Sequence, residues 1–237
     1  MAWIRPLGQR GHRLEWPLLL TLFVAAAALW AFAELAGEVL EGDTRTFDRA
    51  ILLALRSPSD LSAPIGPRWM QETMRDFTAL GGVAVLTIMT LAVAAYLTLI
   101  RKGRAALGML IAVAGGMLLS SLLKYGFERP RPEFVPHGAY VYTSSFPSGH
   151  STMSAVVYLT LGAFVARLRH EWRIKIFAIS LAVFLTLLVG VSRIYLAVHW
   201  PTDVLAGWTL GAGWALLCWA VVLWLQRGGR IEPESRD

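Results

Sequence analysis

Three short polar stretches interrupt an otherwise apolar chain, and together they carry the residue types that phosphate chemistry needs. They read KYGFERPRP from Lys124, PSGH from Pro147 and SRIYLAVHWPTD from Ser192. Arginine and lysine side chains bind phosphate oxygens, and a histidine beside a carboxylate can act as a nucleophile. The three stretches therefore predict a site that holds a phosphate group and attacks its phosphorus.

The third stretch contains the candidate nucleophile. Pro201 is suited to the first turn of a helix, which places His199 just before that helix and Asp203 in its first turn. A carboxylate so placed can fix the tautomer of the imidazole and leave the other ring nitrogen free to act. The alternatives are an Asp203 that only complements the helix dipole and a His199 that is an ordinary interfacial polar residue.

The second stretch has the features of an anion-binding helix start. Ser148 is a good N-cap, Gly149 lets a ligand approach the backbone closely, and His150 follows at once. Free N–H groups and the positive end of the dipole make a helix N-terminus suitable for phosphate. An ordinary capped helix start is the alternative for this short motif.

Cationic candidates come from the first and third stretches. Lys124 lies at the end of an apolar segment, where lysine often only reaches for the membrane interface. Arg129 and Arg131 are competing candidates for gripping phosphate oxygens, and spacing alone does not choose between them. Arg193 lies one loop before His199 and is also placed for phosphate.

The elements that position these residues are expected to be membrane-spanning helices. The chain has 237 residues, 56% hydrophobic and 16% charged, against about 25% charged in soluble domains. Its net charge is +6 without a five-residue basic run, so nucleic acid is not an expected partner. A span needs about 20 mainly apolar residues. We predict six spans in a single membrane domain, at about 17–36, 81–100, 105–123, 151–166, 176–191 and 202–225.

The placement of basic residues predicts the orientation. With six spans, 13 of the 22 lysines and arginines fall on one side, which the positive-inside rule assigns to the cytoplasm together with both termini. All three polar stretches then lie on the outer side. An alternative treats the first span as a cleaved signal peptide, which leaves five spans. The 13 residues are Arg5, Arg10, Arg13, Arg101, Lys102, Arg104, Arg167, Arg169, Arg173, Lys175, Arg227, Arg230 and Arg236.

Residues 38–80 form the longest connection, on the predicted outer side. Apolar residues recur there at helical spacing, which indicates either a short amphipathic helix on the membrane surface or a packed cap over the bundle. These residues are Phe47, Ala50, Ile51, Ala54 and Leu55.

The three stretches resemble the three-part signature of the phosphatidic acid phosphatase type 2 superfamily. The matching pattern is Lys124-x6-Arg131-Pro132, then PSGH at 147–150, then Ser192-Arg193-x5-His199-x3-Asp203. The resemblance implies that His199 forms a phosphohistidine, that Asp203 orients it, and that His150 is the general acid. It also implies that the phosphate is held by Lys124, Arg131, Ser148, Gly149 and Arg193, which selects Arg131 over Arg129.

The resemblance implies a lipid phosphatase in the bacterial cytoplasmic membrane with its site facing outward. The compact size and short loops resemble bacterial members. By analogy we favour undecaprenyl diphosphate, a phosphorylated carrier presented at the outer face, as substrate. Phosphatidylglycerophosphate, phosphatidic acid and lipid A phosphates are alternatives. No acidic pair has two-metal spacing near the site, so no metal or other cofactor is expected. Six spans argue against the soluble haloperoxidases of this superfamily. An anion-binding transporter is the rival from another class, although it has no need for a His-Asp pair beside a second histidine.

Overall fold

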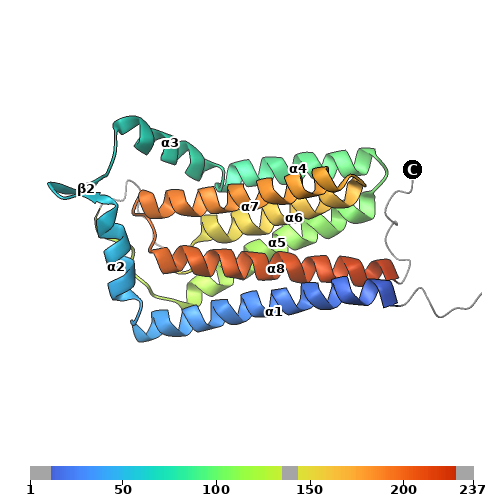
Figure 1. Ribbon diagram of the computed structural model, residues 1–237, viewed down its shortest axis with the longest axis horizontal. Coiled ribbons are helices and arrows are strands. Elements are labelled where there is room, and N and C mark those ends of the chain that lie inside the picture. Colours follow the sequence, from blue (N-terminus) through green and yellow to red (C-terminus); the bar gives the residue numbers. More distant parts are fainter. Residues whose placement is uncertain (1–11, 135–143, 228–237) are drawn as a thin grey trace, which may run out of the picture.

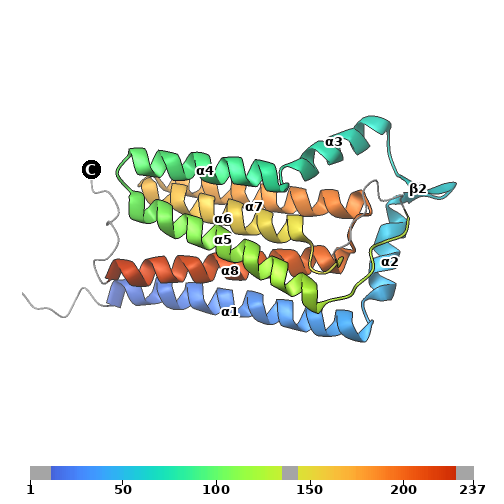
Figure 2. The ribbon, with the colours of Figure 1, turned by 180° about the vertical axis from the view of Figure 1, so that it is seen from behind.

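The computed structural model describes residues 12–134 and 144–227. In this part of the chain, long helices lie side by side in one bundle, and a short connection of helices and strands covers one end (Figures 1 and 2). The elements are α1 (His12–Glu41), α2 (Arg45–Ala54), β1 (Arg56–Ser57), β2 (Asp60–Pro64), α3 (Arg68–Ala79), α4 (Val83–Leu99), α5 (Gly103–Gly126), α6 (Gly149–Leu168), α7 (Trp172–Tyr195) and α8 (Pro201–Arg227).

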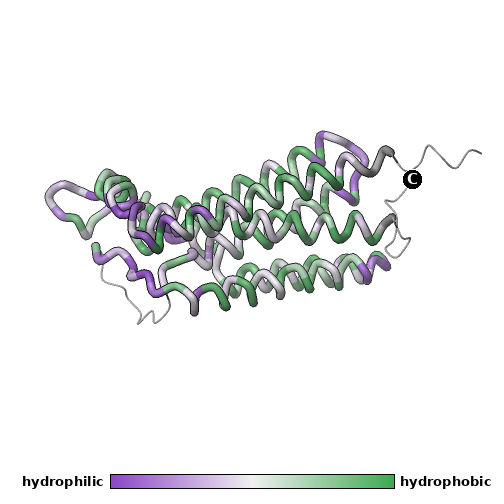
Figure 3. The backbone as a smooth tube through the Cα atoms, turned by 90° about the horizontal axis from the view of Figure 1, so that it is seen from below, coloured by the Kyte–Doolittle hydropathy of each residue, from purple (hydrophilic) through white to green (hydrophobic). Residues whose placement is uncertain are grey.

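The long helices have the lengths and composition of membrane spans. Within the described residues, five of them qualify individually, namely α1, α5, α6, α7 and α8. With its 17 residues α4 is short for a span, but α3 and α4 pass the same test as one span bent by 47°. The bundle is apolar along its middle and polar at its ends, as expected for a protein that crosses a bilayer (Figure 3). The prediction of an all-α membrane bundle is confirmed.

Helix α6 lies at the centre of the bundle and packs against α5, α7 and α8. In its most apolar window 61% of the residues are buried, compared with 6% in α1, which packs along α8 at the edge. Helices α6 and α8 come close at Gly211, where an added Cβ would lie 2.5 Å from the carbonyl oxygen of Thr152. Small residues permit such contacts between membrane helices. The central helix thus carries the PSGH stretch at its N-terminal end on a well-packed support.

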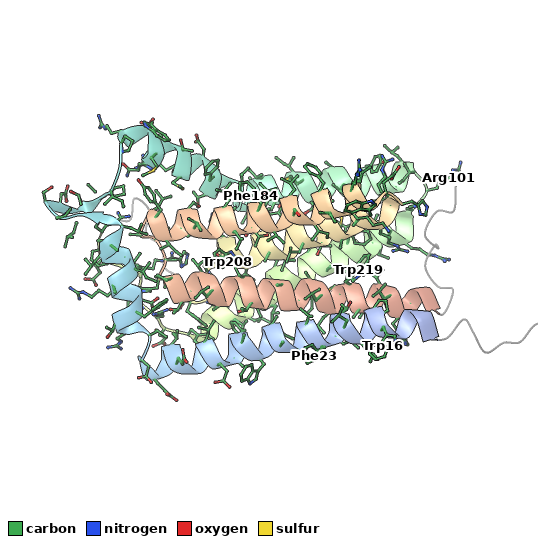
Figure 4. All side chains as sticks on the ribbon, viewed as in Figure 1. Trp16, Phe23, Arg101, Phe184, Trp208 and Trp219 are labelled. Carbon is green, nitrogen blue, oxygen red and sulfur yellow. The ribbon has the colours of Figure 1, made fainter. Side chains whose placement is uncertain are left out.

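The two ends of the bundle differ in what they carry. The starts of α1 and α5 and the end of α8 lie at one end, where Arg101 is seen (Figure 4). The end of α5, the start of α6, the end of α7 and the start of α8 lie at the other end, beside α2 and α3. All three polar stretches therefore lie at one end of the bundle. Arg5, Arg10, Arg230 and Arg236 of the orientation argument lie outside the described residues.

The connection at 38–80 folds into α2, an antiparallel pair of β1 and β2, and α3. Helix α2 and its flanks turn Thr44, Asp48, Leu52 and Arg56 inward, each at the spacing of one helical turn, and all four are buried. Phe47, at the first position of the apolar pattern, is 52% exposed. Three of these four inward positions are therefore polar, and Asp48 is the polar one within α2 itself. This face lies against the site end of the bundle.

Candidate active site

The three polar stretches form one cluster. An added Cβ at Gly149 would lie 3.2 Å from Nζ of Lys124, so the end of α5 touches the start of α6. His150 interacts electrostatically with Lys124, Arg131, Arg193 and His199, which come from α5, the segment after it, α7 and the α7–α8 loop. Segments far apart in sequence thus bring the eight predicted residues into one region. They are Lys124, Arg131, Ser148, Gly149, His150, Arg193, His199 and Asp203.

His199 is buried, and each of its ring nitrogens has a defined neighbour. Nδ1 lies 3.4 Å from Oδ2 of Asp203 and 3.3 Å from Oγ of Ser145. Nε2 lies 3.0 Å from Nη1 of Arg131. Since a guanidinium only donates hydrogen bonds, Nε2 must accept, and the ring proton belongs on Nδ1 toward the carboxylate. This tautomer leaves the Nε2 lone pair directed at the cationic side of the site.

Burial also sets the charge of this imidazole. It lowers the pKa of His199 to about 4, although the hydrogen bond and charge of Asp203 act in the opposite direction. The ring is therefore neutral near pH 7, which is the protonation state a nitrogen nucleophile requires.

Asp203 is held by more donors than the sequence indicated. Its Oδ2 accepts hydrogen bonds from the hydroxyl of Ser145 at 2.5 Å and from the backbone N–H of Trp200 at 2.9 Å. Its Oδ1 accepts one from Nη1 of Arg129 at 2.6 Å. Ser145 was not singled out from the sequence, and its place two residues before PSGH was the only signal that could have found it. These bonds fix the carboxylate that faces His199.

The structure separates the two competing arginines. Nη1 of Arg131 donates to the carbonyl oxygen of Val198 and to the His199 ring, and within the described residues its buried Nε has no hydrogen-bond partner. Burial lowers the pKa of Arg131, with Asp203 opposing, and an arginine nevertheless stays charged. Arg129 instead donates to the carboxylates of Asp203 and Asp48. Arg131 therefore faces the ring of His199, while Arg129 lies behind Asp203.

The remaining predicted residues surround the start of α6. Ser148 is the N-cap of this helix, as predicted, and its hydroxyl accepts from the N–H of Ser151. On α7, Nη1 of Arg193 donates to the hydroxyl of Thr78 at 3.0 Å. The buried Nε of Arg193 has no hydrogen-bond partner in the part of the chain that the structure describes. A buried donor without a partner is costly, and phosphate oxygens would satisfy it.

An apolar groove reaches this cluster from the side of the bundle. It has a volume of about 540 Å³ and lies between α4, α5 and α6. Leu86, Leu110 and Val157 line it along its length, and Lys124 and His150 line it where it meets the polar cluster. A groove that is apolar along the bundle and cationic at one end suits a molecule with a long apolar chain and an anionic head.

This combination of a membrane-spanning bundle, a cationic cluster with a His-Asp pair and an apolar groove is that of a membrane lipid phosphatase. The PAP2 superfamily matches residues 105–227, which contain the whole cluster. A phosphatidylglycerophosphatase B of Bacillus subtilis is 37% identical over 148 residues, which cover 60% of this chain and 70% of that protein. An undecaprenyl-diphosphatase of Sulfolobus acidocaldarius is 28% identical over 117 residues, covering 47% of this chain and 52% of its own length.

A solved structure has the same fold. The crystal structure of a transmembrane PAP2-type phosphatidylglycerolphosphate phosphatase from Bacillus subtilis superposes with a TM-score of 0.76 at 30% identity. The match covers 86% of this chain and 98% of that one. The chain belongs to the PAP2 superfamily, and it is an integral membrane lipid phosphate phosphatase.

Proposed function

We propose that this protein hydrolyses lipid phosphates through a phosphohistidine on His199. The observation that carries the proposal is the neutral, buried imidazole whose Nε2 faces Arg131 while Nδ1 faces Asp203. The fixed tautomer, the low pKa and the adjacent cations are what a nitrogen nucleophile needs to attack a phosphoryl group.

The first step transfers the phosphoryl group to the enzyme. Phosphate oxygens take over the N–H groups of Arg131 and Arg193, which frees Nε2 of His199. Nε2 then attacks phosphorus, so that a P–N bond forms while the bond to the lipid oxygen breaks. His150 protonates the departing oxygen, and Asp203 stabilises the positive charge that develops on the ring of His199.

The second step regenerates the free enzyme. His150, now neutral, removes a proton from a water molecule that attacks the phosphorus. The P–N bond breaks, inorganic phosphate leaves, and His199 returns to its neutral form. Lys124, Arg131, Arg193 and the N-terminus of α6, with Ser148 and Gly149, hold the phosphate oxygens and stabilise the charge in both steps.

The groove and the relatives together narrow the substrate. The apolar walls of α4, α5 and α6 support a substrate with a long hydrocarbon chain. Undecaprenyl diphosphate, predicted from the resemblance, is our first candidate. Phosphatidylglycerophosphate is the second candidate. It is supported by the Bacillus subtilis relative named for that activity, which matches 60% of this chain, compared with 47% for the undecaprenyl-diphosphatase.

The decisive experiment measures inorganic phosphate released by purified protein in detergent micelles. Undecaprenyl diphosphate, phosphatidylglycerophosphate, phosphatidic acid and lipid A are compared, each with and without excess EDTA. We expect release that survives EDTA and stops with vanadate, which mimics pentacoordinate phosphorus. No release from any lipid, with anion transport in vesicles instead, would favour the transporter. Activity lost in EDTA and restored by magnesium would contradict the proposed metal-free site.

Filling the groove should weaken the binding of a long-chain lipid but not that of a small soluble substrate. Ala114 on α5 lines the groove and is exposed to it, so Ala114→Trp would occupy the space that a lipid chain needs. We expect KM for the long-chain substrate to rise about tenfold, whereas hydrolysis of soluble p-nitrophenyl phosphate stays within about twofold.

A matched substitution separates groove filling from a general effect of bulk. Ala95 on α4 is also exposed but does not line the groove, so Ala95→Trp should leave both activities near wild type. Equal losses on both substrates in Ala114→Trp would show that the groove does not hold the lipid chain.

We further propose that the site faces the exterior and that both termini are cytoplasmic. Two exposed positions test this in a Cys218→Ala background, with a membrane-impermeant thiol reagent on intact cells. A cysteine at Ser59, between β1 and β2 at the site end, should react, whereas one at Gly103, at the start of α5, should not. Labelling at Gly103 alone would reverse the orientation.

A further inference from the structure

Asp48 is a completely buried carboxylate that no step of the proposed mechanism uses. It comes from α2, yet its Oδ1 accepts the backbone N–H of Thr202 at 2.9 Å and its Oδ2 accepts the Thr202 hydroxyl at 2.6 Å. Thr202 is the second residue of α8. The indole of Trp200, just before Pro201, only donates a hydrogen bond, to the carbonyl oxygen of Pro130, and so cannot cap this helix. Asp48 therefore caps the N-terminus of α8 from a separate helix.

Arg129 connects this carboxylate to the one beside His199. Its Nη2 donates to Asp48 at 2.5 Å, and its Nη1 donates to Asp203 at 2.6 Å. The guanidinium is planar and rigid, so the position of one carboxylate defines the position of the other. Both carboxylates are fully buried, and removing one partner from such an arrangement leaves a buried charge without compensation.

The link through Arg129 decides which oxygen of Asp203 faces His199. Oδ1 is occupied by Arg129, which leaves Oδ2 for Ser145, the N–H of Trp200 and the imidazole. Without the Asp48 carboxylate, the guanidinium of Arg129 loses one of its two carboxylate partners and α8 loses its cap. The hydroxyls of Thr44 and Thr202, which also accept from Arg129, carry no charge that could replace it. Asp203 sits in the first turn of that helix, so both changes act on its position.

We propose that Asp48 is a positioning residue for the reaction: through Arg129 and Thr202 it fixes Asp203, and thereby the ring of His199. This inference rests on the proposed role of His199 as nucleophile. It assigns a catalytic purpose to the connection at 38–80, in which Asp48 joins α2 to the start of α8.

The charges of Asp48 and Arg129 predict opposite shifts of the pH profile in the two variants, which a purely structural role of these residues would not produce. Asp48→Asn leaves the positive charge of Arg129 less balanced, which disfavours protonated His199 and moves the acidic limb of kcat/KM to lower pH. Arg129→Gln leaves two carboxylates nearby, which favours protonated His199 and moves that limb to higher pH. Both variants leave the other charged or titratable groups around His199 unchanged. Those that interact with its ring are Arg131, His150, Arg193 and Asp203, and Lys124 lies beside them.

The experiment measures kcat, KM and the pH profile of the full-length protein on the lipid that the wild type hydrolyses. We expect Asp48→Asn to lower kcat roughly ten- to a hundredfold, the cost of a slightly misplaced catalytic group, with KM within about twofold. Asp43→Asn, an exposed carboxylate of the same connection, should match the wild type. The double variant should be no slower than the worse single variant, since both act through one link.

Thermal unfolding of each variant checks that the protein is folded. If Asp48→Asn does not fold, Arg129→Gln tests the same link. Two results would overturn the positioning role. One is an unchanged kcat in a folded Asp48→Asn protein, and the other is an acidic limb of kcat/KM that shifts in the same direction in both single variants. Those results leave the proposed function standing as long as the wild type forms a phosphohistidine. A wild type that turns over lipid without phosphorylating His199 would refute the proposed function itself.

Discussion

Replacing His199 with alanine is expected to abolish turnover, with a loss of roughly a thousandfold or more in kcat. The substitution removes the nitrogen proposed to attack phosphorus. Of its neighbours, Arg131 is a cation, Asp203 is occupied by three donors, and His150 is assigned to protonate the leaving group, so we expect none of them to replace it. The measurement is phosphate release, combined with acid-quenched trapping of the phosphoenzyme from labelled substrate. The wild type should show an acid-labile phosphate on His199, and the variant should show none.

The control uses a histidine remote from the site. His170 lies exposed in the turn between α6 and α7, at the other end of the bundle. His170→Ala should retain both turnover and phosphoenzyme. Near wild-type phosphate release by His199→Ala would rule out the covalent mechanism, and phosphate trapped on another residue would relocate the nucleophile.

Because the pKa of His199 is about 4, the same mechanism predicts an acidic limit to activity. The ring attacks only when neutral, so kcat/KM should fall as pH drops through about 4 and be independent of this group above it. An exposed histidine would instead place this limb near 6.5.

Replacing His150 with alanine is expected to produce a loss that depends on the leaving group. As general acid, His150 supplies a proton to a lipid alkoxide, which is a poor leaving group, so a phosphate monoester of a lipid should be hydrolysed about a hundredfold more slowly or worse. A p-nitrophenolate leaves without protonation, so the loss on p-nitrophenyl phosphate should be less than about tenfold. The measurement compares kcat for the two substrates in the same preparation.

His150→Gln provides the matched variant, since it keeps polarity and approximate size without a titrating proton. It should follow His150→Ala in its dependence on the leaving group. Equal losses on both substrates would assign His150 to phosphate binding and leave the general acid to another group. This alternative has a structural basis, because His150 and Lys124 both line the groove where it meets the polar cluster.

Local sequence determined much of the site because several of its parts are local. Ser148 caps α6 because a serine hydroxyl three residues before an N–H fits the first turn of a helix. Pro201 begins α8, which places His199 just before that helix and Asp203 in its first turn, in mutual reach. The count of spans likewise predicted that all three polar stretches share one end of the bundle.

Other parts depend on contacts that no spacing encodes. Arg129 and Arg131 are two residues apart and chemically identical, and only the packed positions of Asp48 and His199 separate their roles. Ser145 is one of several serines near PSGH, and its bond to Asp203 joins residues 58 apart in sequence. The inward face of α2 carries the carboxylate of Asp48 as well as Leu52, so an apolar periodicity along this helix indicates Phe47 and not Asp48.

The sequence by itself determined that this chain is a membrane bundle with a polar, cationic cluster at one end, because hydrophobic length, helix starts and the order of the three stretches are all readable along the chain. Only the tertiary structure decided which contacts hold the cluster in position. Asp48 and Thr202 are 154 residues apart, and their bond exists because α2 folds back over the start of α8. Burial there makes every carboxylate require a partner, and the identity of that partner is set by packing rather than by position in the sequence.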